Sequence, residues 1–204
     1  MRTKSALVEE FRTSEIQEAA LRVISRRGLD GTSMQAVAKE AGIAKGTIYL
    51  YFKNRDDMVA RTASWAVAQL MKGLEPILAE TDRRPFALRL RSLMETKIRF
   101  FHERRQFFRL YLATCGADKA TRRQRNHEHL EQYLTSLAAL LRRAMARGEI
   151  RRADARRLAL FLAEGVHAVI IRRLSEAKSP SPSEEADWIV TLLLGGLAKK
   201  GGRR

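Results

Sequence analysis

Residues 33–55 read SMQAVAKEAGIAKGTIYLYFKNR, and their spacing predicts a helix, a tight turn and a second short helix. Ser33 can cap the first helix by accepting a hydrogen bond from one of its free N–H groups. Gly42 stands where a left-handed residue would end that helix. Ile48 and Phe52 repeat at helical spacing and give the second helix a buried face. We therefore expect a helix-turn-helix.

The opposite face of the second predicted helix carries small and polar residues. It offers a cation, a bare stretch of backbone, a hydroxyl and a flat ring, supplied by Lys45, Gly46, Thr47 and Tyr49. Groups of this kind recognise phosphate oxygens and base edges in a major groove. An enzyme would have little use for such a surface, so the segment predicts DNA reading.

The same segment resembles the TetR-type bacterial transcriptional regulators. The shared pattern is Ala41-Gly42, then Lys45-Gly46-Thr47-Ile48-Tyr49-Leu50-Tyr51-Phe52, then Asn54-Arg55. The resemblance covers roughly residues 14–58, and the rest of the chain agrees only in its helical layout. It implies an all-α protein with an N-terminal three-helix DNA-binding domain. A C-terminal helical bundle would bind a ligand and form a dimer.

Particular contacts follow as hypotheses from this resemblance. Base edges are expected to meet Gln35, Lys45 and Tyr49, while Gly46 permits close approach of the helix backbone. Phosphates are expected to be held by Thr47, Tyr51 and Arg55. For Arg55 the alternative is an ordinary solvated side chain.

Three residues depart from the family pattern. Ala44 stands where a serine or threonine usually caps the second helix, and Ala36 replaces the acidic partner of the first cap. Leu50 occupies a position that is often polar or aromatic. We expect these changes to alter affinity and operator preference without removing the motif.

The composition fits a helical chain of one or two domains, since 45% of the 204 residues are apolar and only four are proline. We expect about nine helices, with a DNA-binding domain in residues 1–58 and a ligand-binding and dimerisation domain in residues 59–204. Outside the motif, the expected helices are Ser14–Arg27, Arg55 to about Ala79, Phe86 to about Glu103, Gln106–Ala113, about Arg122–Arg147, Asp154 to about Glu176 and about Glu184–Lys200. Asn54 and Asp57 are expected to cap the helix that begins at Arg55. Residues 1–12 are expected to form a mobile arm, and Pro76 is expected to break the connection after the fourth helix.

The net charge of +16 lies mostly outside the DNA-reading segment, because residues 1–54 hold nine basic and six acidic residues. The excess fits either solvated helix faces or general attraction to DNA and anionic ligands. The sequence has a single cysteine, Cys115, no signal-peptide pattern and no apolar run long enough for a membrane span. These features predict a cytoplasmic protein, nucleoid-associated when bound to DNA, with no membrane partner.

The last two predicted helices have unusually broad apolar faces. The candidate interface residues are Phe161, Val169, Ile170, Leu174, Trp188, Leu192 and Gly196. A four-helix interface between two copies would bury them, with Gly165 and Ala168 allowing close approach. The alternative is the core of a monomer. A homodimer would also suit a pseudo-palindromic double-stranded operator with half-sites about one turn, ~34 Å, or more apart.

Aromatic and polar residues in the middle of the chain suggest an effector pocket. The candidates are Trp65, Phe101, Phe108, Tyr111, His127 and His167. Such residues suit a small molecule, although an ordinary bundle core is the alternative. No cofactor or metal is expected, because His127 and His129 point about 200° apart around one helix. Catalytic spacings are also missing from the sequence.

Together these patterns predict a sequence-specific DNA-binding regulator, more specifically a repressor released from its operator by a small-molecule effector. The effector would act through different affinities for two dimer states. Two rivals remain open at this point. One is a non-specific nucleic-acid-binding protein driven by charge, and the other is an enzyme that carries a helix-turn-helix.

Overall fold

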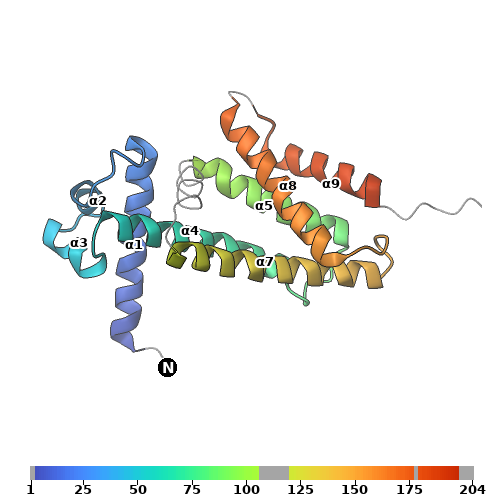
Figure 1. Cartoon of the computed structure of the whole chain (residues 1–204), viewed down its shortest axis with the longest axis horizontal. Coiled ribbons are helices and arrows are strands. Elements are labelled where there is room, and N and C mark those ends of the chain that lie inside the picture. The colour runs from blue at the N-terminus through green and yellow to red at the C-terminus, as the bar shows by residue number, and fades with distance from the viewer. Residues whose placement is uncertain (1–2, 106–119, 177–178, 198–204) are drawn as a thin grey trace, which may run out of the picture. The chain divides into compact units, whose positions relative to one another are not determined.

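The computed structural model describes residues 3–105, 120–176 and 179–197, which form eight α-helices and no β-strand (Figure 1). The all-α prediction is confirmed. The helices are α1 Lys4–Arg27, α2 Met34–Glu40, α3 Lys45–Tyr51, α4 Arg55–Leu78, α5 Phe86–Glu103, α7 Ala120–Ala146, α8 Ala155–Ser175 and α9 Pro182–Leu197. The further helix expected at Gln106–Ala113 lies outside the described residues.

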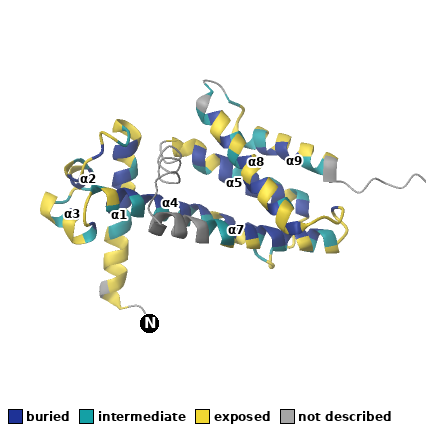
Figure 2. Ribbon diagram, viewed as in Figure 1, coloured by how far each residue is buried: buried dark blue, intermediate teal, exposed yellow. Residues whose placement is uncertain are grey.

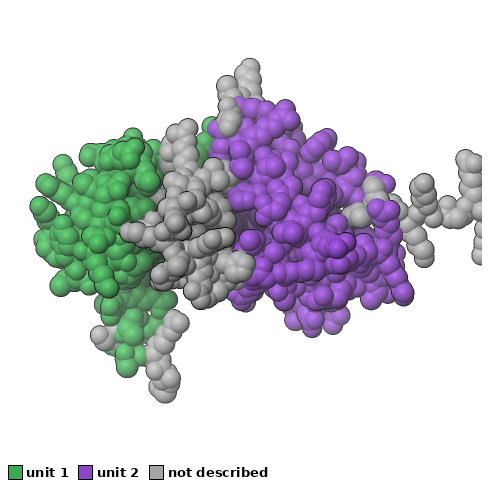
Figure 3. Space-filling view, in the orientation of Figure 1, with its two compact units in different colours: residues 1–69, 104–126 green, residues 70–103, 127–204 purple. Residues whose placement is uncertain are grey.

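The chain divides into two compact units, which Figure 3 shows in different colours. Unit 1 comprises residues 1–69 and 104–126, and unit 2 comprises residues 70–103 and 127–204. Compactness does not show where a domain folds independently. The expected boundary after residue 58 therefore stays a prediction.

In unit 1, α1 packs on α2 and α2 packs on α3 around one apolar core. Val23 of α1, Val37 of α2 and Ile48 of α3 are all at most 2% exposed. Full burial of a side chain of this size contributes roughly 1.5–3 kcal/mol. Arg22 of α1 also donates to the Glu40 carboxylate at the end of α2, at 2.8 Å, and this hydrogen bond lowers the pKa of Glu40. The core fixes how α3 is presented.

The first helix begins at Lys4, so the predicted start at Ser14 was wrong. Thr3 caps it by accepting a hydrogen bond from a backbone N–H of its first turn at 3.4 Å. Ser14 looks like a cap in the sequence, but its hydroxyl donates to the carbonyl of Phe11 at 2.7 Å within the helix. The arm expected at residues 1–12 is thus helical from Lys4 onwards, and this extension is largely exposed (Figure 2).

Local signals set the ends of α2, α3 and α4 as the sequence predicts. Ser33 accepts a backbone hydrogen bond from the first turn of α2 at 3.1 Å. Gly42 has φ 68°, the left-handed conformation that turns the chain into α3. Ala44 caps α3 without any side-chain hydrogen bond. Asn54 accepts a hydrogen bond from the N–H of Asp57 at 2.9 Å, which confirms the expected cap of α4.

The ends of α4 and α9 can be compared with the expected bounds. Pro76 lies inside α4, which continues to Leu78 and so ends one residue from the expected Ala79. The last helix begins at Pro182, because Ser181 and Glu184 form a capping box with hydrogen bonds of 3.2 and 2.7 Å. The cap therefore starts α9 two residues before the expected Glu184.

In unit 2, α5 packs against both α8 and α9. Its buried residues recur every three or four positions and form one continuous face, visible in Figure 2. They are Phe86, Arg89, Leu90, Leu93, Met94, Lys97, Ile98 and Phe101. Two of these residues, Arg89 and Lys97, carry a formal charge, which is unusual for a core position.

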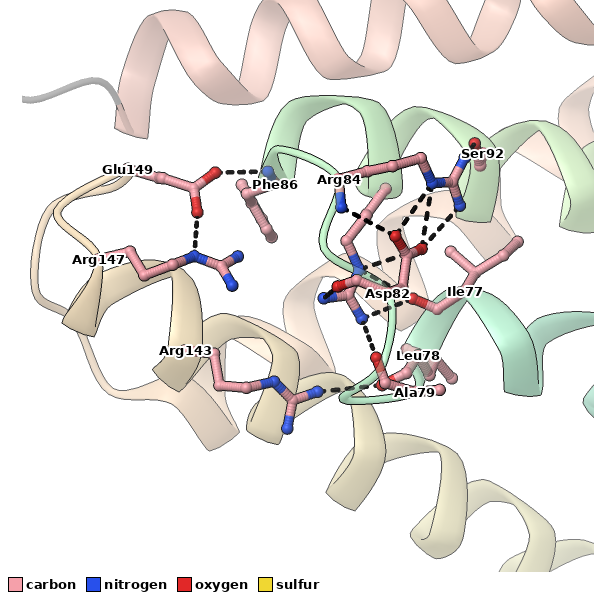
Figure 4. A network of polar contacts seen from close by, with 11 residues as sticks. Ile77, Leu78, Ala79, Asp82, Arg84, Phe86, Ser92, Arg143, Arg147 and Glu149 are labelled. Carbon is pink, nitrogen blue, oxygen red and sulfur yellow. Dashed lines mark hydrogen bonds and ion pairs between the residues drawn. The ribbon is translucent and has the colours of Figure 1, made fainter.

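Arg89 has many partners, and Figure 4 labels three of them, Ile77, Ala79 and Asp82. The fully buried Arg89 donates to the carbonyls of Ile77 and Ala79, each at 2.7 Å, and to that of Asp82 at 3.0 Å. The Asp82 carboxylate lies 3.5 Å from Arg89 Nε. Hydrogen bonds from Arg84 lower the pKa of Asp82 to about 2. Arg89 thus has a structural role, since it binds the free carbonyls at the end of α4.

Candidate nucleic-acid interface

The short helix α3 is anchored by one face and presents the other to solvent. Ile48 is fully buried, and Phe52, directly after the helix, is 1% exposed. Tyr49 is 50% exposed and Leu50 is 81% exposed. Lys45, at the first position of the helix, is also exposed. The expectation that Ile48 and Phe52 are core residues that orient α3 is confirmed.

The residues predicted to contact DNA fall into two groups. Gln35 of α2 and the α3 residues Lys45, Gly46 and Tyr49 are exposed, whereas Thr47, Tyr51 and Arg55 are half-buried. The exposed group can reach base edges without rearrangement of the core. Thr47 and Tyr51 are half-buried, so their hydroxyls suit contact with a backbone phosphate better than insertion into a groove. Contact with DNA stays a prediction for each of them.

Gly46 stands at the second position of α3 without an internal reason to be glycine. A Cβ built on it would meet no heavy atom of the described residues within 4 Å, and its φ is not positive. Glycine inside a helix costs about 1 kcal/mol relative to alanine. The bare backbone at Gly46 is therefore explained best by a partner outside the chain that approaches closely.

Arg55 is held by hydrogen bonds to backbone carbonyls of unit 1. Its Nε donates to the carbonyl of Thr32 at 2.8 Å, and its Nη2 donates to the carbonyl of Leu29 at 2.5 Å. Both carbonyls belong to the connection between α1 and α2. The guanidinium thus ties the start of α4 to this connection, and contact of Arg55 with a phosphate stays a prediction.

Arg61 is a supporting residue that the sequence analysis missed. It donates to the carbonyl of Tyr51 at the end of α3, and its guanidinium lies 4.6 Å from the centre of the Phe52 ring. Asp57, one turn earlier on α4, lies 3.8 Å from Arg61 and helps to hold it. A cation at the C-terminus of a helix is favourable. The Asp57–Arg61 spacing was the available signal, although it does not identify the acceptor.

The candidate effector residues are only partly described. Trp65 is half-buried in unit 1, whereas in unit 2 Phe101 is buried and His167 is half-buried. Phe108 and Tyr111 lie outside the described residues, as does the side chain of His127. Burial and the charge of Lys97 lower the pKa of His167, so its imidazole is neutral at pH 7. Binding of an effector by these residues stays a prediction.

Lys97 is a buried cation of unit 2 that the sequence analysis did not select. It is 8% exposed, and its ammonium lies 3.5 Å from the Tyr133 hydroxyl and 4.7 Å from the centre of the Tyr133 ring. Burial lowers the pKa of Lys97 to about 8 and raises the pKa of Tyr133. The signal in the sequence was a lysine on the apolar face of α5, between Met94 and Phe101.

The predicted dimer residues differ in exposure. Phe161 of α8 is 66% exposed, and Trp188 and Leu192 of α9 are 57% and 61% exposed. Val169 and Leu174 are half-buried, and Gly196 is described only as part of the α9 backbone. Ile170 is 2% exposed, so it belongs to the core of unit 2 and not to a free surface. The sequence analysis missed Leu160 and Ile171, which are also exposed on α8.

The described residues include no group of three or more His, Cys, Asp or Glu side chains arranged to hold a metal ion. None of the described helices is both long enough and apolar enough to cross a membrane.

Comparison with known proteins covers both parts of the chain. Residues 16–62 match the family model described as bacterial regulatory proteins, tetR family. Residues 84–197 match the model described as tetracyclin repressor-like, C-terminal domain. The fatty acid metabolism regulator protein of Bacillus subtilis is 31% identical over 139 residues, which are 67% of this chain and 70% of that protein. An HTH-type transcriptional regulator of Haemophilus influenzae is 38% identical over 89 residues, 44% of this chain and 46% of that protein.

Solved structures share the fold of about nine-tenths of the chain. FadR from Bacillus subtilis, in complex with stearoyl-CoA, has a TM-score of 0.76 at 22% identity, covering 90% of this chain and 98% of that one. The fatty acid degradation regulator FadR from Bacillus halodurans has a TM-score of 0.77 at 22% identity, covering 93% and 97%. At this identity the likeness concerns the fold.

Proposed function

This chain belongs to the TetR family of bacterial regulatory proteins and is a DNA-binding transcriptional regulator, and we propose that it is a homodimeric repressor that a small-molecule effector releases from its operator. The family is one of transcriptional regulators and not of enzymes. Because the operator is chromosomal DNA, the protein would act in the cytoplasm.

The observation that carries the proposed reading mechanism is the outer face of α3. Lys45, Gly46 and Tyr49 are exposed together on a helix whose Ile48 is fully buried. The buried face fixes the orientation of the helix, while the outer face combines a cation, a ring and open backbone. Together these features suit insertion into a major groove.

Individual roles follow from exposure. Gln35, Lys45 and Tyr49 would reach base edges, and Gly46 would let the DNA backbone approach α3 closely. Thr47 and Tyr51 would donate hydroxyl hydrogen bonds to phosphates. Arg55 donates to two carbonyls of unit 1, so its remaining N–H groups would hold the phosphate.

The proposed dimer rests on the exposed faces of α8 and α9. Phe161 and Trp188 are each more than half exposed, although both are large and apolar. Gly165 of α8 and Gly195 of α9 are exposed as well, and a Cβ on either would meet no heavy atom of the described residues within 4 Å. Apolar side chains beside bare helix backbone suit close packing of helices from a second copy. Two copies would present two α3 helices to a pseudo-palindromic operator.

The relatives suggest the chemical class of the effector. The Bacillus subtilis relative is named a fatty acid metabolism regulator, and the FadR structure from the same organism holds stearoyl-CoA. We infer that this chain responds to a molecule with an acyl chain, bound in unit 2. The effector would favour a dimer state whose α3 helices do not match the operator, and its preference for that state would supply the energy of release.

Selection of DNA from a random duplex library by the full-length protein tests the proposed function. We expect enrichment of a pseudo-palindromic site with half-sites about one turn, ~34 Å, or more apart. Addition of decanoyl-CoA is then expected to release the selected duplex. Recovery of unrelated sequences would instead favour the rival function, non-specific binding driven by the charge of +16.

A further inference from the structure

Lys97, a buried cation of unit 2, is poorly compensated by the described residues. The Lys97 ammonium has three N–H donors, and among the described residues its hydrogen-bond partner is the Tyr133 hydroxyl at 3.5 Å. That distance is long for a hydrogen bond. No carboxylate of the described residues lies within 4.0 Å of the ammonium. The face of the Tyr133 ring, 4.7 Å away, offers a cation–π contact but no counter-charge.

Arg89, also on α5, is a buried cation with a structural role, and its partners can be compared with those of Lys97. Its guanidinium donates to three backbone carbonyls and lies 3.5 Å from the Asp82 carboxylate. Among the described residues, Lys97, two turns further along α5, has no comparable set of partners. A buried charge without a close partner is costly, and an apolar residue of similar volume is often equally or more stable. The cost at Lys97 therefore calls for a partner from outside the chain.

The surroundings of Lys97 indicate what this partner is. On α5 it is flanked by the buried apolar side chains of Met94, Ile98 and Phe101. On α8, the charge of Glu164 interacts with Lys97, the charge of Lys97 lowers the pKa of His167, and the Glu164 side chain is 58% exposed. The cation thus lies among apolar groups, with a polar edge that reaches solvent at α8. A ligand with an apolar chain and an anionic group matches both features.

We propose that Lys97 is the anchor for the anionic group of the effector, donating to a carboxylate or phosphate oxygen while the Tyr133 hydroxyl donates beside it. This proposal rests on the proposed function, because it assigns a residue to the effector site of the regulator. The acyl chain of the effector would lie against the apolar face of α5. Lys97 therefore makes the site selective for anionic amphiphiles over neutral ones.

Isothermal titration calorimetry of the full chain with three probes tests the anchor. The probes are decanoate, which offers a carboxylate, decanoyl-CoA, which offers phosphates, and decan-1-ol, which has the same chain length and no charge. We expect the wild-type protein to bind at least one anionic probe ten or more times tighter than decan-1-ol. The anionic probe that is preferred identifies the group that Lys97 receives.

Lys97→Met is expected to abolish this preference and to leave the affinity for decan-1-ol within about twofold of wild type. Lys72→Met, which removes an exposed lysine of α4, is the matched control and is expected to behave like the wild type. Lys97→Gln gives the same comparison if the methionine variant does not fold. Preference for an anionic probe that survives in the folded variants, or no preference in the wild type, would overturn the proposal.

Binding of each protein to the duplex selected from the random library is measured in the same preparations. A wild-type protein that binds this duplex specifically but shows no anionic preference refutes the anchor alone. A wild-type protein without specific DNA binding refutes the proposed function. The two failures are therefore distinguishable.

Discussion

Replacement of Lys97 by methionine is expected to stabilise the ligand-free protein near neutral pH. Burial lowers the pKa of Lys97 from its ordinary 10.5 to about 8. Each pKa unit corresponds to about 1.4 kcal/mol, so the charged form costs the folded state about 3 kcal/mol at pH 7. Methionine has a similar length and no charge. This cost is an upper bound on the rise in the free energy of unfolding, because methionine loses the contact of the ammonium with the Tyr133 ring.

The stabilisation by Lys97→Met is expected to depend on pH. The pKa of Lys97 is lower in the folded state, so between about pH 8 and 10.5 the unfolded chain binds more protons and wild-type stability rises with pH. The cost is full below this window and absent above it. The advantage of Lys97→Met is therefore expected to shrink by about 2 kcal/mol between pH 7 and pH 10. Tyr133 stays protonated in the folded state, because burial raises its pKa.

Urea unfolding of both proteins at pH 7, 8.5 and 10, followed by circular dichroism, measures this difference. Titrations shared by the two proteins cancel in the comparison. Lys72→Met changes an exposed lysine and is expected to follow the wild type at every pH. A stability difference between wild type and Lys97→Met that stays constant from pH 7 to pH 10 would refute the reasoning, because Lys97 would then not be a buried cation.

Two further substitutions test other parts of the structure. Ala44→Ser supplies the side-chain cap that α3 lacks and is expected to raise the free energy of unfolding by about 1 kcal/mol in urea unfolding; an unchanged or lower value would contradict this reading of the helix start. Trp188→Glu places a charge on the exposed apolar face of α9 and is expected to convert the proposed dimer to a monomer in analytical ultracentrifugation. Leu88→Glu, at a 50% exposed residue of α5, should leave the dimer intact, and a monomeric wild type would contradict the proposed interface.

Features that depend on local interactions could be predicted from the sequence. Ser33, Gly42 and Asn54 act within one or two turns of their own position, and the structure places all three as expected. The start of α1 could not be predicted in this way. Thr3 and Ser14 are both typical cap residues, and only the hydrogen bond of the Ser14 hydroxyl within the helix separates them.

Features that depend on contacts between distant residues could not be predicted from spacing. The hydrogen bonds of Arg55 could not be predicted, because the carbonyls that accept them lie 23 and 26 residues earlier in the chain. Lys97 looked like an ordinary lysine of an amphipathic helix until Tyr133 of α7 was placed beside it. Periodicity indicates which face of a helix is buried, but it does not show which buried polar group lacks a partner.

On α8, the sequence did not show which apolar residues of the candidate dimer surface are exposed. The broad apolar face of α8 was evident from the sequence, but its division between core and surface was not. Ile170 is buried in unit 2, whereas the next residue, Ile171, is 41% exposed. Packing against α5 makes this distinction, and the sequence of α8 alone does not contain it.

The central claim is that the exposed face of α3 reads base edges, and the affinity of the protein for two duplexes tests it most directly. The duplexes are the site selected from the random library and a scrambled version of the same composition, compared at physiological salt. We predict that the wild-type protein prefers the selected site by roughly 10³-fold or more. Lys45→Ala should lose about 1–3 kcal/mol on that site alone, while Lys72→Ala should bind like the wild type. Equal affinity of the wild-type protein for both duplexes would contradict the account.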